Sequence, residues 1–259
     1  MSFGTTIPVT GLNLGAIGQV SRLGERVITS RPVFAGAGST NINFGDTVVI
    51  TPNATGGGDT YQTVAGFIAA GGIMAPSLFA GVANREVKTN LAYTSLGNSG
   101  TPQIAYYAPN ELAEALERGS IVVKINNGTP KSQSAVFLRT VLNGGIPAGV
   151  VGGLEAVADA AVNTTAAALT TNSTTLTVAS AVGIAVGQLI TGIGIPSNTF
   201  VTVVAGTTLT LSQAATVANA AALNFASTID LSAVGVIFRT GVLDANGCAE
   251  ITLKQRVAA

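Results

Sequence analysis

The chain has 259 residues, with twelve Lys and Arg balanced by twelve Asp and Glu, no His and one Cys. The absence of His excludes a Ser-His-Asp triad, a Cys-His pair and any His-based metal site, and a single Cys excludes a disulfide within the chain. Charged residues make up 9% of the chain, against about 25% in typical soluble domains. A sparsely charged, neutral surface is poorly protected against self-association. Two interpretations therefore stay open: much of the surface faces other protein, or the chain is an ordinary soluble protein of modest solubility. We expect no nucleic-acid partner, since the charge balance lacks a basic footprint.

The first 17 residues are uncharged and Gly-rich, and they show no strand periodicity. This pattern predicts a flexible N-terminal arm, which would add backbone hydrogen bonds to a strand edge of a neighbouring subunit. The candidate interface residues of the arm are Thr5, Ile7, Val9, Leu12 and Leu14.

Short runs rich in β-branched residues follow the arm, and such runs predict strands. The predicted strands outside the charge-free segment are residues 19–20, 26–29, 47–51, 63–68, 78–83, 103–107, 120–125, 136–141, 234–240 and 249–254. The Asn-Gly pairs at 127–128 and 246–247 predict tight turns.

Residues 64–83 carry no charge over 20 positions, which is long enough for a membrane span. The stretch is mostly Gly and Ala, however, and Pro76 and Ser77 interrupt it. We therefore expect two buried strands joined by turns, and no membrane partner.

Residues 110–119 predict the single helix of the chain. Asn110 suits an N-cap, Glu111 suits the first turn, and Arg118 and Gly119 suit the end. The apolar residues that would share one face and cover an apolar surface are Leu112, Ala115 and Leu116.

Residues 160–229 contain no Asp, Glu, Lys or Arg, and Thr alternates with aliphatic residues in them. The segment also repeats itself, because TTLTVASA at 174–181 resembles TTLTLSQA at 207–214. Alternation with a period of two is typical of half-buried strands. We therefore predict a small inserted all-β domain over 160–229 that projects outward. Its candidate core consists of Leu176, Val178, Leu189, Ile190, Ile193, Ile195, Val201, Val203, Leu209, Leu211, Leu223 and Phe225.

The sequence predicts no catalytic residue, no cofactor and no metal site. Residues 36–38 (GAG) lack the remaining glycine and the following helix of a dinucleotide loop, and residues 244–247 (DANG) lack the spacing of a calcium loop. Cys248 is expected to be a buried, inert thiol. Three carboxylates on the predicted helix remain as candidates for acid–base chemistry. We expect them to lie on its exposed side as ordinary solvated surface groups: Glu111, Glu114 and Glu117.

Several stretches together resemble the structural cement, or head decoration, proteins of tailed bacteriophages, the Gp24-like cement family. The stretches that carry the resemblance are 18–27 (GQVSRLGERV), 42–49 (INFGDTVV), 79–89 (FAGVANREVKT), 107–124 (YAPNELAEALERGSIVVK), 136–140 (VFLRT) and 238–254 (FRTGVLDANGCAEITLK). The charge-free segment interrupts this pattern and resembles a Thr/Gly-rich β-module of phage structural proteins.

The resemblance implies an all-β, barrel or jelly-roll-like body formed by residues 18–159 and 230–259, with one short helix. It implies a non-enzymatic protein that binds the major capsid protein on the outer surface of the virion, after assembly in the bacterial host cytoplasm. Such a protein bridges capsomers as a homo-oligomer, a dimer or a trimer, at a capsid symmetry axis. Two alternatives remain: the insert binds a host-surface glycan or protein, or a carboxylate pair performs hydrolysis.

Overall fold

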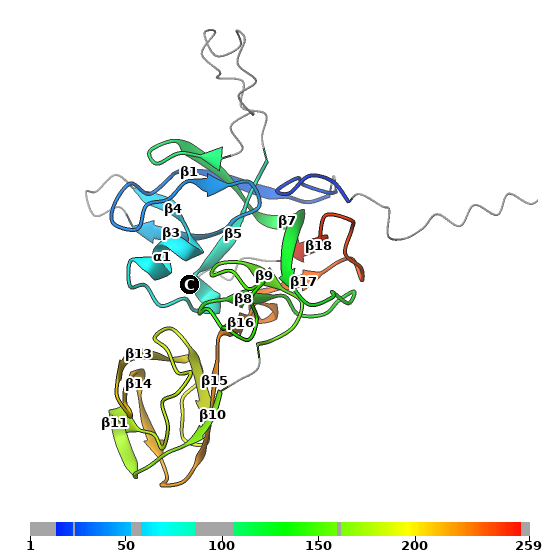
Figure 1. Ribbon diagram of the computed structural model, residues 1–259. Coiled ribbons are helices and arrows are strands. Elements are labelled where there is room, and N and C mark those ends of the chain that lie inside the picture. Colours follow the sequence, from blue (N-terminus) through cyan, green and yellow to red (C-terminus); the bar gives the residue numbers. More distant parts are fainter. Residues whose placement is uncertain (1–13, 23, 53–57, 86–105, 160–161, 255–259) are drawn as a thin grey trace, which may run out of the picture.

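The computed structural model describes residues 14–22, 24–52, 58–85, 106–159 and 162–254. Within them nearly all regular structure is strand, which confirms the all-β prediction. The strands form two lobes: a larger body, and a smaller lobe that follows residue 159 and returns to the body before residue 228 (Figure 1).

The body is built on one ten-stranded, curled sheet and a separate two-stranded pair. The sheet contains β1 (Val27–Pro32), β3 (Thr47–Pro52), β4 (Asp59–Thr63), β5 (Phe79–Ala83), β7 (Leu112–Asn127), β8 (Phe137–Arg139), β9 (Leu154–Glu155), β16 (Thr228–Asp230), β17 (Val236–Phe238) and β18 (Cys248–Leu253). The two-stranded pair consists of β2 (Ile42–Asn43) and β6 (Tyr106–Tyr107).

β7 organises the body, because its two halves pair with different strands. The first half lies between β1 and β5, whereas the second half pairs with β18 and then with β9. Gly119 lies where the pairing of β7 with β1 gives way to its pairing with β18, at a φ of 127° that residues with a side chain rarely adopt. Beyond β5 the sheet continues through β3 to β4, and an isolated bridge from Val33 to Tyr61 returns it to the end of β1. These strands therefore curl towards a barrel.

The predicted helix at 110–119 is wrong, because these residues enter β7. Asn110 lies in a turn at a φ of 68° rather than at a helix N-cap. Ala113, Ala115 and Glu117 are buried on one face of the strand. Pairing with β1 and β5 on both edges gives the strand more backbone hydrogen bonds than a short helix offers, and this tertiary context overrides helix propensity.

The strand predicted at 63–68 is also wrong, because the chain forms α1 (Val64–Ala69) there. The Thr63 hydroxyl accepts a hydrogen bond from the backbone N–H of Gly66, at 3.0 Å, and so caps the helix. Of the two strands expected in 64–83 only β5 exists, preceded by a 3₁₀ turn (Pro76–Leu78).

The smaller lobe is a six-stranded sheet in the order β10 (Val162–Thr165), β15 (Ala222–Ala226), β12 (Leu189–Gly192), β13 (Thr199–Ala205), β14 (Thr208–Val217) and β11 (Thr170–Thr177). A bridge between Ala166 and Val178 links the ends of the two edge strands, so this sheet also curls towards closure. We name this lobe, residues 162–226, the insert lobe.

The insert lobe has a core of its own, and most of the predicted core residues lie in it. Those that it contains are Leu176, Val178, Ile190, Val201, Leu209, Leu211, Leu223 and Phe225, with Ile195 packed against them. Two were predicted wrongly, because Ile193 is 87% exposed in the turn after β12 and Val203 is 50% exposed on β13. Leu189 packs instead against the body core. Whether the lobe folds as an independent domain stays a prediction.

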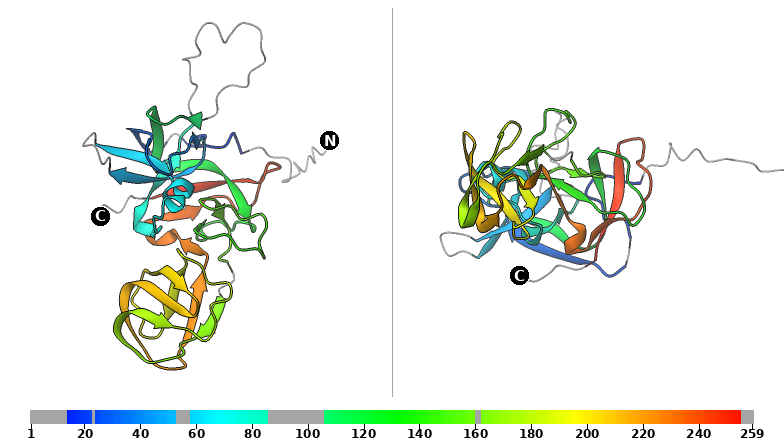
Figure 2. Two further views of the ribbon diagram at one scale, coloured as in Figure 1. Left: turned by 60° about the vertical axis from the view of Figure 1, so that its left-hand side comes forward. Right: turned by 90° about the horizontal axis from the view of Figure 1, so that it is seen from below.

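A buried ion cluster lies in the body, beside the points where the chain leaves the body after Asp159 and re-enters it at Thr228. Arg139 on β8 donates through Nε and Nη2 to the Glu155 carboxylate and through Nη1 to Asp159, at 2.9 Å. All three side chains are fully buried. Burial disfavours the guanidinium charge, but the bonds and charges of the two carboxylates raise the pKa of Arg139 above its usual value. The backbone N–H of Asp159 donates to the Thr228 hydroxyl at 3.0 Å, which fixes the two connections side by side (Figure 2).

The insert lobe contributes further contacts to this junction. The Thr140 hydroxyl donates to the carbonyls of Ser227 and Gly187, at 3.2 and 3.4 Å, and Gln188 Nε2 donates to Ser227 Oγ at 3.1 Å. Phe200, at the start of β13, is buried in the core cluster of the body. The two lobes therefore share apolar packing as well as hydrogen bonds.

Candidate functional site

Of the predicted interface residues only Leu14 is described, and the other four lie outside the described residues: Thr5, Ile7, Val9 and Leu12. Leu14 is half-buried, and its backbone N–H donates to Asp244 Oδ2 at 3.3 Å. The chain then runs along the second half of β7, where the N–H of Gly18 donates to the carbonyl of Val122 at 2.8 Å. The described end of the arm is thus attached to the body.

The motif at 244–247 forms a turn between β17 and β18. Asp244 Oδ1 accepts the backbone N–H groups of Asn246 and Cys248, both at 2.8 Å. Burial alone would raise the pKa of Asp244, but these bonds and the one from Leu14 lower it below its usual value. Cys248 is a buried free thiol, and burial raises its pKa, as expected for an inert cysteine.

The three carboxylates expected on an exposed helix face have different surroundings. Glu111 accepts the N–H of Ala108 at 2.7 Å, and Glu114 accepts from the amide of Asn84 at 3.0 Å. Glu117 is buried and accepts the Tyr61 hydroxyl at 2.9 Å, so its predicted exposure is wrong. Burial, together with the charge of Glu117, raises the pKa of that tyrosine. Each of these carboxylates thus accepts a hydrogen bond from a different residue.

Within the described ranges no group of three or more His, Cys, Asp or Glu side chains has a geometry that could hold a metal ion. Among the same residues, the helices are all too short or too polar to cross a membrane.

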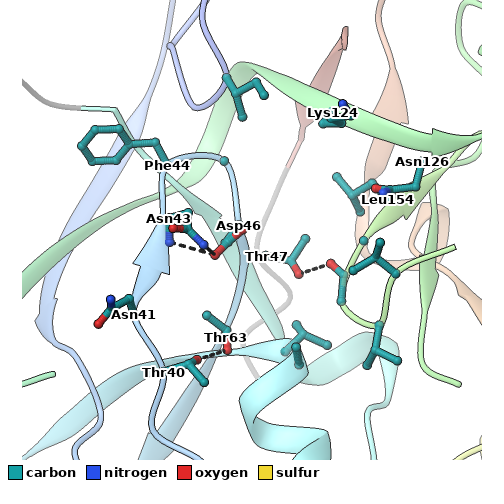
Figure 3. A pocket seen from close by; sticks show the side chains of 18 residues that line it. Thr40, Asn41, Asn43, Phe44, Asp46, Thr47, Thr63, Lys124, Asn126 and Leu154 are labelled. Atoms are coloured by element: carbon teal, nitrogen blue, oxygen red, sulfur yellow. Dashed lines mark hydrogen bonds between the residues drawn. The ribbon is translucent and has the colours of Figure 1, made fainter. Parts of the chain in front are cut away.

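A cleft of about 530 Å³ lies between the β2–β3 turn, the start of α1, the second half of β7 and the loop at 150–154 (Figure 3). The Asp46 carboxylate accepts the backbone N–H and the side-chain amide of Asn43, at 2.8 and 3.0 Å, and burial raises its pKa. The Thr47 hydroxyl donates to the carbonyl of Gly152 at 2.6 Å. Lys124 lies on the β7 side of the cleft. The Asn43–Asp46 bonds shape the β2–β3 turn, and the Thr47–Gly152 bond joins the start of β3 to the loop on the opposite wall.

A second depression, of about 410 Å³, lies where the middle of β7 meets the end of β18 and the turn before β1. Four of its lining side chains are cations: Arg22, Arg118, Arg239 and Lys254. Glu25 is the single carboxylate among the lining residues, and Ser120 and Thr252 contribute hydroxyl groups. We name it the basic depression. The sequence did not predict it, because its cations are spread over more than 230 positions of the chain.

Two ion pairs hold part of this charge. Arg22 Nε lies 2.7 Å from the Glu250 carboxylate, and Arg118 Nη2 lies 2.5 Å from that of Glu25. The Glu250 side chain is buried, which by itself would raise its pKa, but Arg22, Ser21 and the nearby charge of Arg239 lower the pKa below its usual value.

A comparison with protein families gives one match, to the model described as "Structural cement protein (E217 gp24/Pam3 gp6)", over residues 3–191. The chain belongs to this cement-protein family. The match extends through the body into the first part of the insert lobe and ends at β12, so the resemblance noted at 238–254 lies outside the matched range. No curated protein matches the chain. Membership of a family of phage structural proteins gives the chain a structural role in the capsid.

Proposed function

We propose that this protein is a capsid decoration protein. It binds the major capsid protein on the outer surface of the phage head, bridges neighbouring capsomers and stabilises the DNA-filled shell. The observation that carries this proposal is the family match over residues 3–191, more than half of the chain. The protein acts through contacts and carries out no catalysis.

The mechanism is multivalent. Each copy contributes modest contacts, and repetition over the shell makes their combined effect large, because attached neighbours raise the effective concentration of every further contact. The copies assemble as a dimer or trimer at a capsid symmetry axis, since closed symmetry is the common solution for homo-oligomers. The low charge of the chain, 9% of its residues, supports a surface that is covered in the assembled state.

The N-terminal arm links subunits in this proposal. Residues 1–13 precede the attached Leu14 and could reach about 40 Å if extended, which is enough to cross to a neighbour. The side chains assigned to this contact are Thr5, Ile7, Val9, Leu12 and Leu14. Extended segments of this kind add to the strand edges of partners.

The insert lobe projects away from the shell and has a second candidate function, binding of a host-surface glycan or protein. One observation favours it: the uncharged lobe exposes large apolar side chains at separate turns, including Leu169, Val182 and Ile193. Heads that carry a protein without residues 162–226 distinguish the two functions. Normal stability with impaired adsorption to the host would assign host binding to the lobe.

Thermal release of DNA from filled heads tests the cement role. A ligand that binds only the intact shell stabilises it by mass action, by about 2.7 kcal/mol per site at a concentration of 100 Kd. Heads with the protein should therefore release DNA at a higher temperature than heads without it. Equal release temperatures would contradict the cement role and favour the host-binding function.

A further inference from the structure

We propose that the basic depression binds a protein segment that carries neighbouring Asp or Glu side chains. This inference rests on the proposed function in that the segment would belong to the capsid protein. Beyond that function, the inference identifies the surface of this chain that makes the contact and the kind of side chain that the partner presents.

The charge distribution is the first argument. The whole chain is neutral, with twelve cations and twelve anions. The basic depression nevertheless gathers four cations against two carboxylates, Glu25 and the buried Glu250, a local net charge of +2. Arg26 is also exposed. It lies beside the basic depression, because its Cβ is 3.3 Å from the position that a Cβ on the lining residue Gly119 would occupy. A positive patch on a neutral protein attracts and orients an acidic partner.

The availability of these cations is the second argument. The two carboxylates pair with Arg22 and Arg118. Arg239 and Lys254 are exposed, and within the described residues neither forms an ion pair. Lys254 and Arg239 can therefore pair with a partner, although the charge of Arg239 also acts on Glu250. The Ser120 and Thr252 hydroxyls hydrogen-bond each other at 2.9 Å, which leaves one of the two hydrogens for a carboxylate. Guanidinium groups match carboxylates well, because two N–H donors can bind both oxygens at once.

The shape of the depression favours an acidic protein segment over nucleic acid. A volume of about 410 Å³ holds a few side chains but does not track a phosphate backbone. Nucleic-acid sites instead present a stripe of cations over many phosphates. Glu25 is 79% exposed at the rim and would repel a continuous row of phosphates. A short segment with one or two carboxylates can instead pair with Arg239 and Lys254, the lining cations that form no ion pair within the described residues.

The test uses the double variant Arg239→Glu/Lys254→Glu, and Arg85→Glu/Lys131→Glu as a control with the same change in charge. Arg85 and Lys131 are exposed and line neither the basic depression nor the cleft. The first readout is binding of fluorescent poly-L-glutamate, measured by anisotropy at several salt concentrations. We expect the affinity for poly-L-glutamate to fall as the salt concentration rises. The double variant should lose at least about tenfold in affinity, and the control should lose less than about threefold. Close charge pairs across an interface have couplings of this size or larger.

The second readout is cosedimentation with heads that lack this protein, after both variants have been shown to melt like the unmodified chain. We expect the double variant to require about tenfold more protein for half occupancy. Equal loss in both variants, or tighter binding of a DNA oligonucleotide than of poly-L-glutamate, would overturn the inference. If the unmodified protein binds poly-L-glutamate but not heads, the proposed function fails while the assigned chemistry of the depression stands.

Discussion

Removal of the Arg139 side chain should destabilise the protein far more than removal of a surface arginine. In Arg139→Met, the Glu155 and Asp159 carboxylates would remain buried without their cation, since all three side chains are fully buried in the folded chain. Breaking a buried ion pair by removing one partner costs about 3–5 kcal/mol. Because two carboxylates lose their cation here, we expect a loss at the upper end of that range.

Arg118→Met is the matched control. Its pair with Glu25 is exposed on both sides, with side-chain exposures of 46% and 79%. Exposed pairs contribute about 0–1 kcal/mol. Urea unfolding followed by far-UV circular dichroism gives the free energies of unfolding of the two variants and the unmodified protein.

A third variant separates the missing charge from the missing side chain. Arg139→Met combined with Glu155→Gln and Asp159→Asn removes all three charges, and it should recover part of the stability, since neutral replacements of buried ion clusters are often tolerated. A loss below about 1 kcal/mol in Arg139→Met, or no recovery in the triple variant, would refute the electrostatic account of the junction.

Three further predictions concern the same two lobes. Gly149→Ala should lower the free energy of unfolding by about 1–3 kcal/mol, because the added Cβ would lie 2.4 Å from Arg139 Nε. Gly144→Ala is the control, because the space around Gly144 is open, and it should change the urea midpoint little. Equal effects of the two substitutions would contradict this prediction. Phe200→Ala should lower the free energy of unfolding by about 3–5 kcal/mol, because it leaves a cavity in the body core. Amide hydrogen exchange should then become faster in the body as well as in the insert lobe. Faster exchange in the lobe alone would disprove shared packing. Asp244→Asn should destabilise the protein at pH 6, and the difference should begin to shrink as the pH falls below about 4. The reason is that the lowered pKa of Asp244 gives stability that is present above the unfolded pKa and is lost as the pH falls through the folded one; a difference that does not shrink between about pH 4 and about pH 2 would contradict this reason.

The strand character of the chain could be predicted because it depends on local patterns. Alternation of Thr with aliphatic residues identified β13 and β14, and the same alternation identified most of the insert core. The pattern fails at turns, where an apolar residue such as Ile193 has no partner strand to pack against. Burial there depends on the path of the chain and not on the period.

The two errors of element type have opposite causes. Residues 112–118 have good helix formers, but β1 and β5 supply partners on both edges, and these neighbours are distant in sequence. Residues 64–69 contain Val and Ile, which favour strands, yet the Thr63 cap and the Gly71 at a φ of 88° after the helix mark a short helix. That cap was a signal the sequence carried.

The charged sites could not be predicted from sequence. Arg139, Glu155 and Asp159 lie within 21 residues, but charged side chains are almost always exposed, and their burial depends on the pairing of β8 with β9, which local sequence does not reveal. The basic depression depends on the pairing of β7 with β18, which brings Arg118 and Lys254 together, and on the bridge from Val20 to Ile121, which places Arg22 beside them. Composition showed a neutral chain and concealed this local excess of positive charge.

Cosedimentation with DNA-filled heads that lack this protein shows whether the protein decorates capsids. The purified protein is titrated onto the heads, and the bound copies per head are counted after centrifugation, with empty precursor shells and bovine serum albumin as comparisons. A capsid decoration protein should bind saturably, at a fixed copy number that matches the capsomer contacts of the shell. Binding that does not saturate, or that does not exceed that of albumin, would contradict this role.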